Sequence, residues 1–143
     1  MAPPAVIFVC ARNAVRSPMA ESLWRRRFGS KAWTMSCGVA PASLPDGHMI
    51  VVMGEKGVDL SDHECRDMDD VAGEPVDLVV CLSEDVDAEA RKFAADRNAA
   101  YAHWPIDEPA IGRDRFLTLA AYRAVRDAID ARILAFAAES DAQ

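Results

Sequence analysis

A cysteine and an arginine near the start of the chain are spaced so that both could act on one bound anion. Cys10 follows the apolar, β-branched run 5–9, which has the length of a strand. Arg16 precedes Ser17 and Pro18, where a helical pattern opens. The residues between Cys10 and Arg16 must therefore turn the chain from a strand into a helix. Backbone N–H groups and the positive end of the helix dipole point into such a turn and form a cradle for an oxyanion.

This cradle favours a reactive cysteine. An arginine can hold a tetrahedral anion with two hydrogen bonds, and the positive field favours the thiolate of Cys10, a nucleophile, over the thiol. The same spacing is also compatible with a buried strand cysteine and a surface arginine. The preceding strand, Asn13 inside the turn and Pro18 at the start of the helix favour the cradle.

The stretch 5–21, AVIFVCARNAVRSPMAE, resembles the signature of the low-molecular-weight protein tyrosine phosphatases and of the arsenate reductases that share their fold. That signature, a hydrophobic strand followed by C-x-x-N-x-x-R-S-P-M-A-E, is matched from Cys10 to Glu21. The resemblance implies that Cys10 attacks phosphorus and that Arg16 binds the equatorial oxygens. It also implies that Asn13 holds the loop in shape and that Ser17 stabilises the thiolate. The substrate-binding loop that it implies consists of Ala11, Arg12, Asn13, Ala14, Val15, Arg16 and Ser17.

A phosphate ester also needs an acid that protonates its leaving group, so a carboxylic acid should face the cradle from another loop. The segment 103–109, HWPIDEP, follows a predicted strand and offers Asp107 and Glu108. In the family the acid is an aspartate directly before a proline, a place that Glu108 takes here. Because glutamate is longer by one methylene, both residues stay candidates. An acidic loop whose prolines only end a strand is the alternative.

The rest of the chain alternates predicted strands and helices. Strands are expected at 31–38, 76–81 and 99–104, and helices at 18–28, 49–56, 84–97 and 113–138. The acidic segment 59–70 is predicted to be irregular. The alternation indicates an α/β fold with a parallel sheet and helices on both faces, and ligands bind beyond the carboxyl ends of its strands. The resemblance implies a three-layer sandwich whose four strands lie in the order 2-1-3-4.

Length and composition indicate one domain over residues 1–143. The first residues lack the pattern of a signal peptide or a membrane span, so a cytoplasmic protein without a membrane partner is expected. The net charge of −7 argues against nucleic acid as a partner. Because the cysteines and histidines lack zinc-type spacing, we expect reduced thiols, structural or surface histidines, and neither a metal nor another cofactor.

Departures from the family pattern leave the substrate open. Pro109 is followed by Ala110, Ile111 and Gly112 instead of the aromatic residues that flank a phosphotyrosine ring in the phosphatases. Arg12 stands where the family often has glycine, and it either points to solvent and attracts anions or folds across the entrance.

The cysteines raise a second question, because arsenate reduction needs thiols that relay a disulfide. The thioredoxin-linked reductases carry relay cysteines after the third strand, where this chain has only Cys81. Cys37 and Cys81 are predicted at the carboxyl ends of the strands beside the first, so either could approach Cys10. The simpler interpretation is that both are small buried hydrophobic residues.

The sequence therefore predicts a cysteine-dependent phosphomonoester phosphatase of the protein-tyrosine type, acting through a cysteinyl-phosphate. Its ligand is phosphate, arsenate or a similar tetrahedral oxyanion, and a phosphoprotein is a candidate partner. Two alternatives stay open. One is an arsenate reductase that uses an external thiol or redoxin, and the other is a catalytically weak regulatory module that binds an oxyanion or a phosphoprotein.

Overall fold

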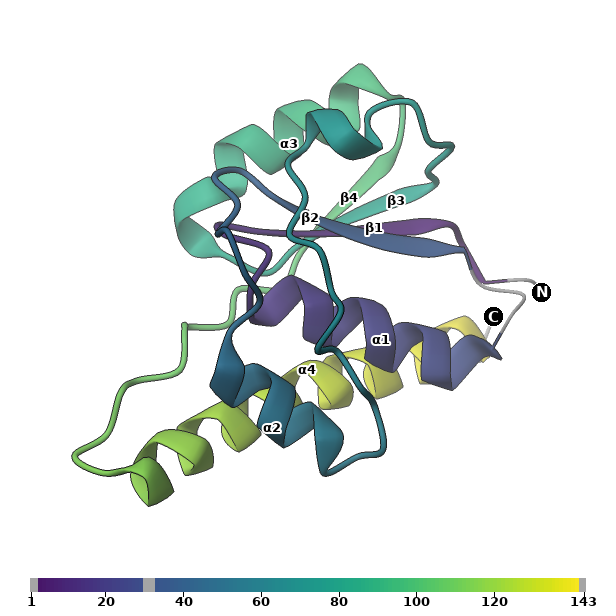
Figure 1. Cartoon of the computed structure of the whole chain (residues 1–143). Coiled ribbons are helices and arrows are strands. Elements are labelled where there is room, and N and C mark those ends of the chain that lie inside the picture. The colour runs from purple at the N-terminus through teal and green to yellow at the C-terminus, as the bar shows by residue number, and fades with distance from the viewer. Residues whose placement is uncertain (1–2, 30–32, 142–143) are drawn as a thin grey trace.

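Four short apolar runs form a parallel sheet at the centre of the computed structural model, which describes residues 3–29 and 33–141 (Figure 1). The strands are β1 (Val6–Cys10), β2 (Thr34–Gly38), β3 (Leu78–Cys81) and β4 (Ala100–His103). They lie in the order β2-β1-β3-β4, and every neighbouring pair is parallel. The predicted strand order is confirmed.

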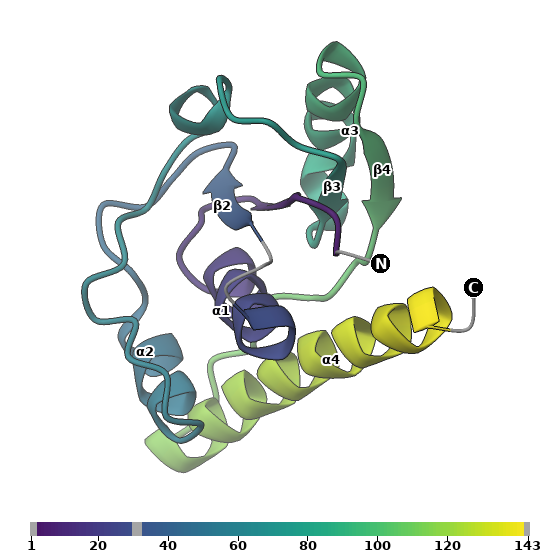
Figure 2. The same cartoon turned by 90° about the vertical axis from the view of Figure 1, so that its right-hand side faces the viewer.

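Helices cover both faces of this sheet, which makes three layers. The α-helices are α1 (Arg16–Phe28), α2 (Gly47–Gly54), α3 (Asp87–Asp96) and α4 (Arg115–Asp141), and two short 3-10 helices are η2 (Asp69–Val71) and η3 (Glu84–Val86). Figure 2 shows α3 on one side of the sheet and α1, α2 and α4 on the other. In the part of the chain that the structure describes, no helix is long and apolar enough to cross a membrane.

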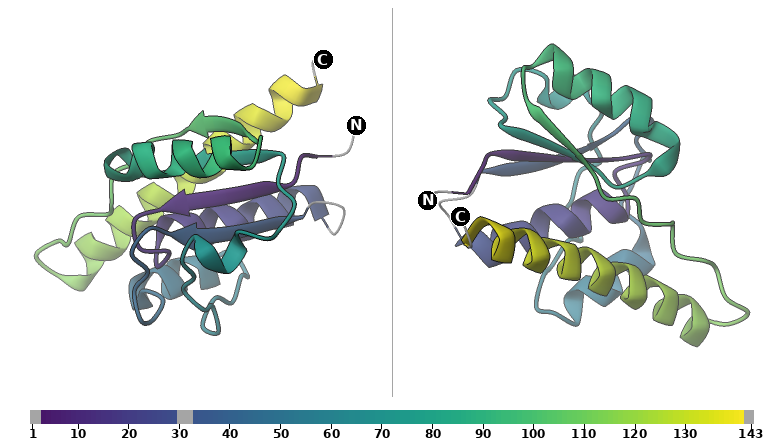
Figure 3. Two further views of the ribbon diagram at one scale, coloured as in Figure 1. Left: turned by 90° about the horizontal axis from the view of Figure 1, so that it is seen from above. Right: turned by 180° about the vertical axis from the view of Figure 1, so that it is seen from behind.

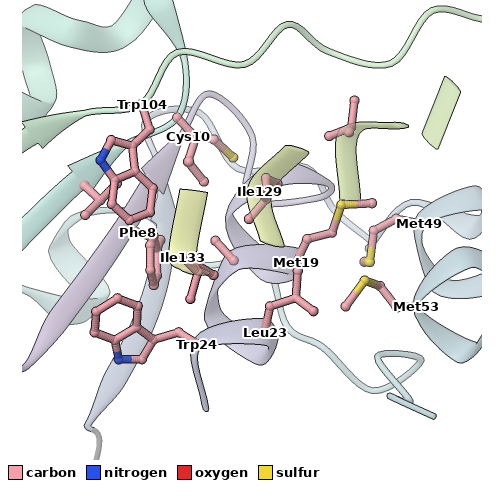
Figure 4. Packing of buried hydrophobic residues seen from close by; sticks show 14 of the residues in the cluster. Phe8, Cys10, Met19, Leu23, Trp24, Met49, Met53, Trp104, Ile129 and Ile133 are labelled. Atoms are coloured by element: carbon pink, nitrogen blue, oxygen red, sulfur yellow. The ribbon is translucent and has the colours of Figure 1, made fainter. Parts of the chain in front are cut away.

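The side chains of β1 alternate between two buried clusters. Phe8 and Cys10 point into the cluster formed with α1 and α4, where Phe8 packs edge-on against Trp24 with ring centroids 5.7 Å apart (Figure 4). Ile7 and Val9 point to the cluster under α3. Burying an apolar side chain of this size contributes about 1.5–3 kcal/mol, so the whole strand is held from both faces.

Several predicted boundaries differ from the structure. Helix α1 begins at Arg16, so Pro18 lies inside the first turn, where the missing N–H costs no helical hydrogen bond. Helix α2 starts at Gly47, earlier than predicted, because Asp46 caps it by accepting the N–H groups of His48 and Met49 at 2.9 and 3.1 Å. The predicted strand 31–38 begins at Thr34, and residues 31 and 32 lie outside the described residues.

The other strands and helices differ from the prediction by a few residues at their ends. The predicted helix 84–97 starts as η3 and continues as α3, and α4 runs over 115–141 instead of 113–138. The segment 59–70 is irregular up to the start of η2, as predicted. The segments that follow β1, β2 and β4 gather at the carboxyl ends of the strands, and Figure 3 shows the last of them running as an extended loop from β4 to α4.

Candidate active site

Two residues allow the tight turn between β1 and α1, one by its backbone conformation and the other by its small size. Asn13 has a φ of 53°, in the left-handed region that asparagine tolerates better than most residues. Gly38, at the end of β2, packs directly on this turn: a Cβ at Gly38 would lie 2.7 Å from the backbone of both Arg12 and Asn13. The loop can therefore lie this close to β2 only because residue 38 is a glycine.

The thiol of Cys10 lies at the bottom of the turn and is almost fully buried. Its Sγ lies 2.9 Å from the Oγ of Ser17 and accepts the backbone N–H of Asn13 at 3.2 Å. Hydrogen bonds that end on sulfur stabilise negative charge there. The site can therefore hold a thiolate without a metal ion beside it.

A buried network holds Asn13 from below. Its Nδ2 donates to Ser17 Oγ at 2.8 Å and to Ser36 Oγ at 2.9 Å. Its Oδ1 accepts the backbone N–H of Arg66 at 2.8 Å, and the Nε2 of His63 lies 3.1 Å from its carbonyl oxygen and 3.2 Å from Oδ1. Because both neighbours of His63 Nε2 are acceptors, this nitrogen carries the proton of the neutral ring. Burial lowers the pKa of His63 and favours that neutral form.

A buried carboxylate completes the network on the side of α1. Glu21 accepts the hydroxyl of Ser36 at 2.6 Å and forms ion pairs with Arg25 at 3.0 Å and Arg66 at 3.5 Å. A buried carboxylate needs such partners because its desolvation is costly. The network thus connects the loop to α1, β2 and the segment before η2.

Arg16 links the cradle to the loop after β4. Its side chain is only 6% exposed; Nη1 donates to the carbonyl oxygen of Ile106 at 2.7 Å, and Nη2 lies 3.3 Å from Oε1 of Glu108. The Glu108 side chain is 58% exposed. The buried guanidinium of Arg16 therefore lines the same cavity as the thiol of Cys10 and pairs with the exposed carboxylate of Glu108.

A cavity of about 380 Å³ opens over Cys10. Glu108 lines it together with Cys10 and Arg16. Asp107 lines a second cavity of about 310 Å³ beside Glu84 and Asp85, and Arg16 and Glu108 line both cavities. The remaining wall of the first cavity consists of Arg12, Ala14, Val15, Ala42, Leu44, Asp46, Pro109, Ile111 and Tyr122. Between the two predicted acids, only Glu108 shares a cavity with the thiol.

The structure distributes the other predicted loop residues between the cavity and its support. Arg12, Ala14 and Val15 line the cavity, while Asn13 and Ser17 lie beneath it. The N–H of Ala11 donates to the Oγ of Ser83 at 3.0 Å.

The sequence did not predict that Ser36, His63 and Ser83 contact the loop between β1 and α1 and hold it in place. These residues are far from the loop along the chain, and no local pattern marks them. A polar residue near the end of a buried strand is a weak signal for Ser36 and for Ser83.

A disulfide from Cys10 to Cys37 or Cys81 does not fit the sheet. Both residues pair with Val9, one residue before Cys10, so their side chains point to the α3 side while Cys10 points to the other. Burial also raises the pKa of the Cys37 thiol. The interpretation of Cys37 and Cys81 as small buried hydrophobic residues agrees with the structure, and all four cysteines are reduced.

Comparison with known proteins finds relatives that match nearly the whole chain. A family model described as "Low molecular weight phosphotyrosine protein phosphatase" matches residues 5–143. The chain is 33% identical over 132 residues to Arsenate reductase 1 of Staphylococcus epidermidis, a match that covers 92% of this chain and 94% of the relative.

Solved structures agree on the fold. A mutant of YwlE from Bacillus subtilis superposes with a TM-score of 0.76 at 23% identity and covers 97% of this chain and 99% of its own. Wzb of Vibrio vulnificus in complex with benzylphosphonate superposes with a TM-score of 0.74 at 20% identity, covering 94% and 97% of the two chains. The family model over residues 5–143 and the 33% identity to the relative from Staphylococcus epidermidis show that the chain belongs to the low molecular weight phosphotyrosine protein phosphatase family.

Proposed function

We propose that the chain is a phosphomonoester phosphatase that works through a cysteinyl-phosphate, with phosphotyrosine as its type of substrate. The observation that carries the proposal is the shared cavity, which brings the thiol of Cys10, the guanidinium of Arg16 and the carboxyl group of Glu108 together. Relatives in the family are named as phosphatases and as arsenate reductases, so an enzymatic role is common to both branches.

In the first step, the thiolate of Cys10 attacks phosphorus from the bottom of the cradle. A bond between sulfur and phosphorus forms, the ester bond between phosphorus and oxygen breaks, and the leaving oxygen takes the proton of Glu108. Arg16 and the backbone N–H groups of the loop hold the charge on the equatorial oxygens.

In the second step, Glu108, now a carboxylate, takes a proton from a water molecule that attacks the cysteinyl-phosphate. The bond between sulfur and phosphorus breaks, and inorganic phosphate and the Cys10 thiolate are released. The hydroxyl of Ser17, 2.9 Å from Sγ, stabilises the sulfur as a leaving group. When the anion binds, it replaces Glu108 as the second partner of Arg16, while Arg16 keeps its bond to Ile106. Because Ile106 belongs to the same loop as Glu108, this bond holds the acid near the reacting atoms.

Arsenate reduction is the second candidate, and the identity to the arsenate reductase of Staphylococcus epidermidis favours it. The same cradle suits arsenate, which is also a tetrahedral oxyanion. Because Cys37 and Cys81 face the other side of the sheet, neither can relay the two electrons from beside Cys10, and an external thiol or redoxin is the source that this candidate function uses.

One experiment compares the candidates. The purified protein is assayed for phosphate release from 4-nitrophenyl phosphate and a phosphotyrosine peptide, and in parallel for arsenite formation from arsenate with glutathione or thioredoxin. We expect phosphate release in the wild type and a loss of at least about 10,000-fold in Cys10→Ser. Arsenite formation without phosphate release would overturn the phosphatase, and tight phosphate binding without either reaction would leave the regulatory module.

A further inference from the structure

Arg12 is an exposed cation at the entrance of the cavity that ends at Cys10. It stands on the rim and Arg16 on the floor, so two guanidinium groups line one cavity. The attacked phosphoryl group occupies the floor, because the thiol and the buried arginine are there. Arg12 is therefore available to a different part of the ligand.

The backbone of Arg12 is fixed. Its carbonyl oxygen accepts the N–H of Ala42 at 2.9 Å, and Gly38 packs against its carbonyl carbon. The next residue, Asn13, is held by the buried network beneath the loop. The exposed side chain of Arg12 therefore starts from a fixed point on the wall of the cavity.

The charge of Arg12 is not neutralised by the protein. Among the residues that the structure describes, none forms an ion pair with it. The two carboxylates that line the same cavity are engaged elsewhere: Glu108 pairs with Arg16, and Asp46 caps α2 and accepts the hydroxyl of Tyr122 at 2.8 Å. An unpaired cation at a cavity mouth attracts negative charge, even in a chain whose net charge is −7.

The second cavity, which shares Arg16 and Glu108 with the first, has the opposite charge. Glu84, Asp85 and Asp107 line it, and none of the three forms an ion pair within the described part of the chain. A negative group on a bound substrate is repelled by these carboxylates and attracted by Arg12. The two cavities together therefore favour one orientation of a charged substrate.

We propose, on the basis of the proposed phosphatase activity, that Arg12 is a specificity residue for phosphomonoesters that carry a second negative charge near the phosphoryl group. Leu44 and Ile111, both more than 70% exposed, line the same cavity and offer apolar surface to the organic group between the two charges. A phosphotyrosine with acidic neighbours has this chemistry, and so does a small aryl phosphate that carries a carboxylate.

The test compares matched substrates. Phosphotyrosine peptides with flanking glutamates or glutamines share one leaving group, and aryl phosphates with a carboxylate or a carboxamide form the small-molecule arm. We expect the wild type to show a kcat/KM about fivefold higher for the acidic member, mainly through KM. The ratio should approach one in Arg12→Gln and fall below one in Arg12→Glu. Arg27→Gln, an exposed arginine at the end of α1, should keep the wild-type ratio.

Binding separates this inference from the proposed function. Dissociation constants of the same peptides with Cys10→Ser report the charge preference without turnover. A protein that hydrolyses no substrate but binds acidic phosphopeptides more tightly, through Arg12, would overturn the phosphatase and support the role of Arg12. A ratio near one in the wild type, or a ratio that survives Arg12→Gln, would overturn the role of Arg12. A preference in the peptide arm alone would assign the second charge to a phosphoprotein.

Discussion

The two loops that build the candidate site are held in very different ways. The phosphate loop, residues 10–17, is buried at Cys10, Asn13, Ala14, Arg16 and Ser17, and it is braced from below by Asn13 and from the side by Gly38. The acid loop, residues 104–114, is largely exposed and has no regular secondary structure. Beside Arg16 it is attached by the bonds of Ile106 to Leu82 and Arg16 and by the ion pair of Glu108.

The two loops therefore suit different parts of the proposed reaction. Attack by sulfur requires donors that already point at the phosphoryl oxygens, which a rigid loop supplies without reorganisation. The acid must leave Arg16, meet the leaving group and then meet a water molecule, and an exposed carboxylate outside any helix or strand can do so. If the comparison is right, changes at the buried residues of the phosphate loop alter both stability and activity, and a change of the exposed Glu108 alters activity alone.

After Cys10→Ser, the largest effect is expected for the acid. Glu108→Gln should lower kcat by about 100- to 10,000-fold for phenyl phosphate, because its leaving group needs the proton, and less for 4-nitrophenyl phosphate. The free energy of unfolding should stay within about 0.5 kcal/mol of the wild type, since the Glu108 side chain is 58% exposed and Arg16 keeps its bond to Ile106. Steady-state kinetics with both esters and urea denaturation check the two parts.

Asp107→Asn is the matched control for the acid. Its carboxylate lines the other cavity, so we expect kcat to stay within about threefold of the wild type. Equal losses in the two variants would show that the loop is shifted in solution and that the difference between Glu108 and Asp107 does not hold.

A smaller effect is expected where the phosphate loop meets β2. Gly38→Ala places a Cβ 2.7 Å from backbone atoms that cannot move away, and such overpacking typically costs about 1–3 kcal/mol of unfolding free energy. Because the displaced atoms belong to the loop, kcat/KM should fall as well. In Gly54→Ala, the added Cβ meets no atom within 4 Å, and the helix gains up to about 1 kcal/mol. Urea denaturation of both variants, with a phosphatase assay, would contradict the tight packing if they behaved alike.

The two asparagines in the left-handed region allow a finer test. Asn13 and Asn98 both have a φ of 53°, but Asn98 is exposed at the end of α3. Alanine at either position costs about 1–2 kcal/mol of backbone strain, and only Asn13→Ala also leaves buried partners of the network unpaired, at about 1–3 kcal/mol more. The difference between the two losses, measured by urea denaturation, isolates the network. Equal losses would remove it as a source of stability.

The sequence predicted the phosphate loop better than the acid loop for a physical reason. The strand, the turn with Cys10 and Asn13, and the helix start at Arg16 are consecutive, so local patterns describe the whole loop. The strand order came from the resemblance and agrees with the structure. The choice between Asp107 and Glu108 depends on how an exposed loop without regular secondary structure turns its side chains, which no periodic pattern encodes.

Contacts over long sequence distances explain the other gaps. His63 contacts the carbonyl oxygen and the side chain of Asn13 from a segment without periodicity. The two residues are 50 positions apart in the sequence, so no local pattern predicts that they meet. The orientation of Cys37 and Cys81 depends on pairing register: a shift of one residue along a strand turns a side chain to the other face. The register depends on how all the strands pair, so it cannot be predicted from the sequence of one strand.

The smallest expected effect concerns His63 and the pH dependence of stability. Burial lowers the pKa of His63 from 6.5 in the folded protein, so the folded state binds fewer protons than the unfolded state just below pH 6.5. The free energy of unfolding should therefore fall as the pH decreases from 7.5 through 6.5, because stability rises with pH wherever the unfolded state binds more protons. His63→Gln keeps a donor for Asn13 but cannot titrate, so part of this pH dependence should disappear, while His48→Gln, at a half-buried position away from the Asn13 network, should retain it. Urea denaturation between pH 5.5 and 7.5 measures the slope, and identical slopes in the wild type and His63→Gln would show that the phosphate loop is braced without the neutral imidazole.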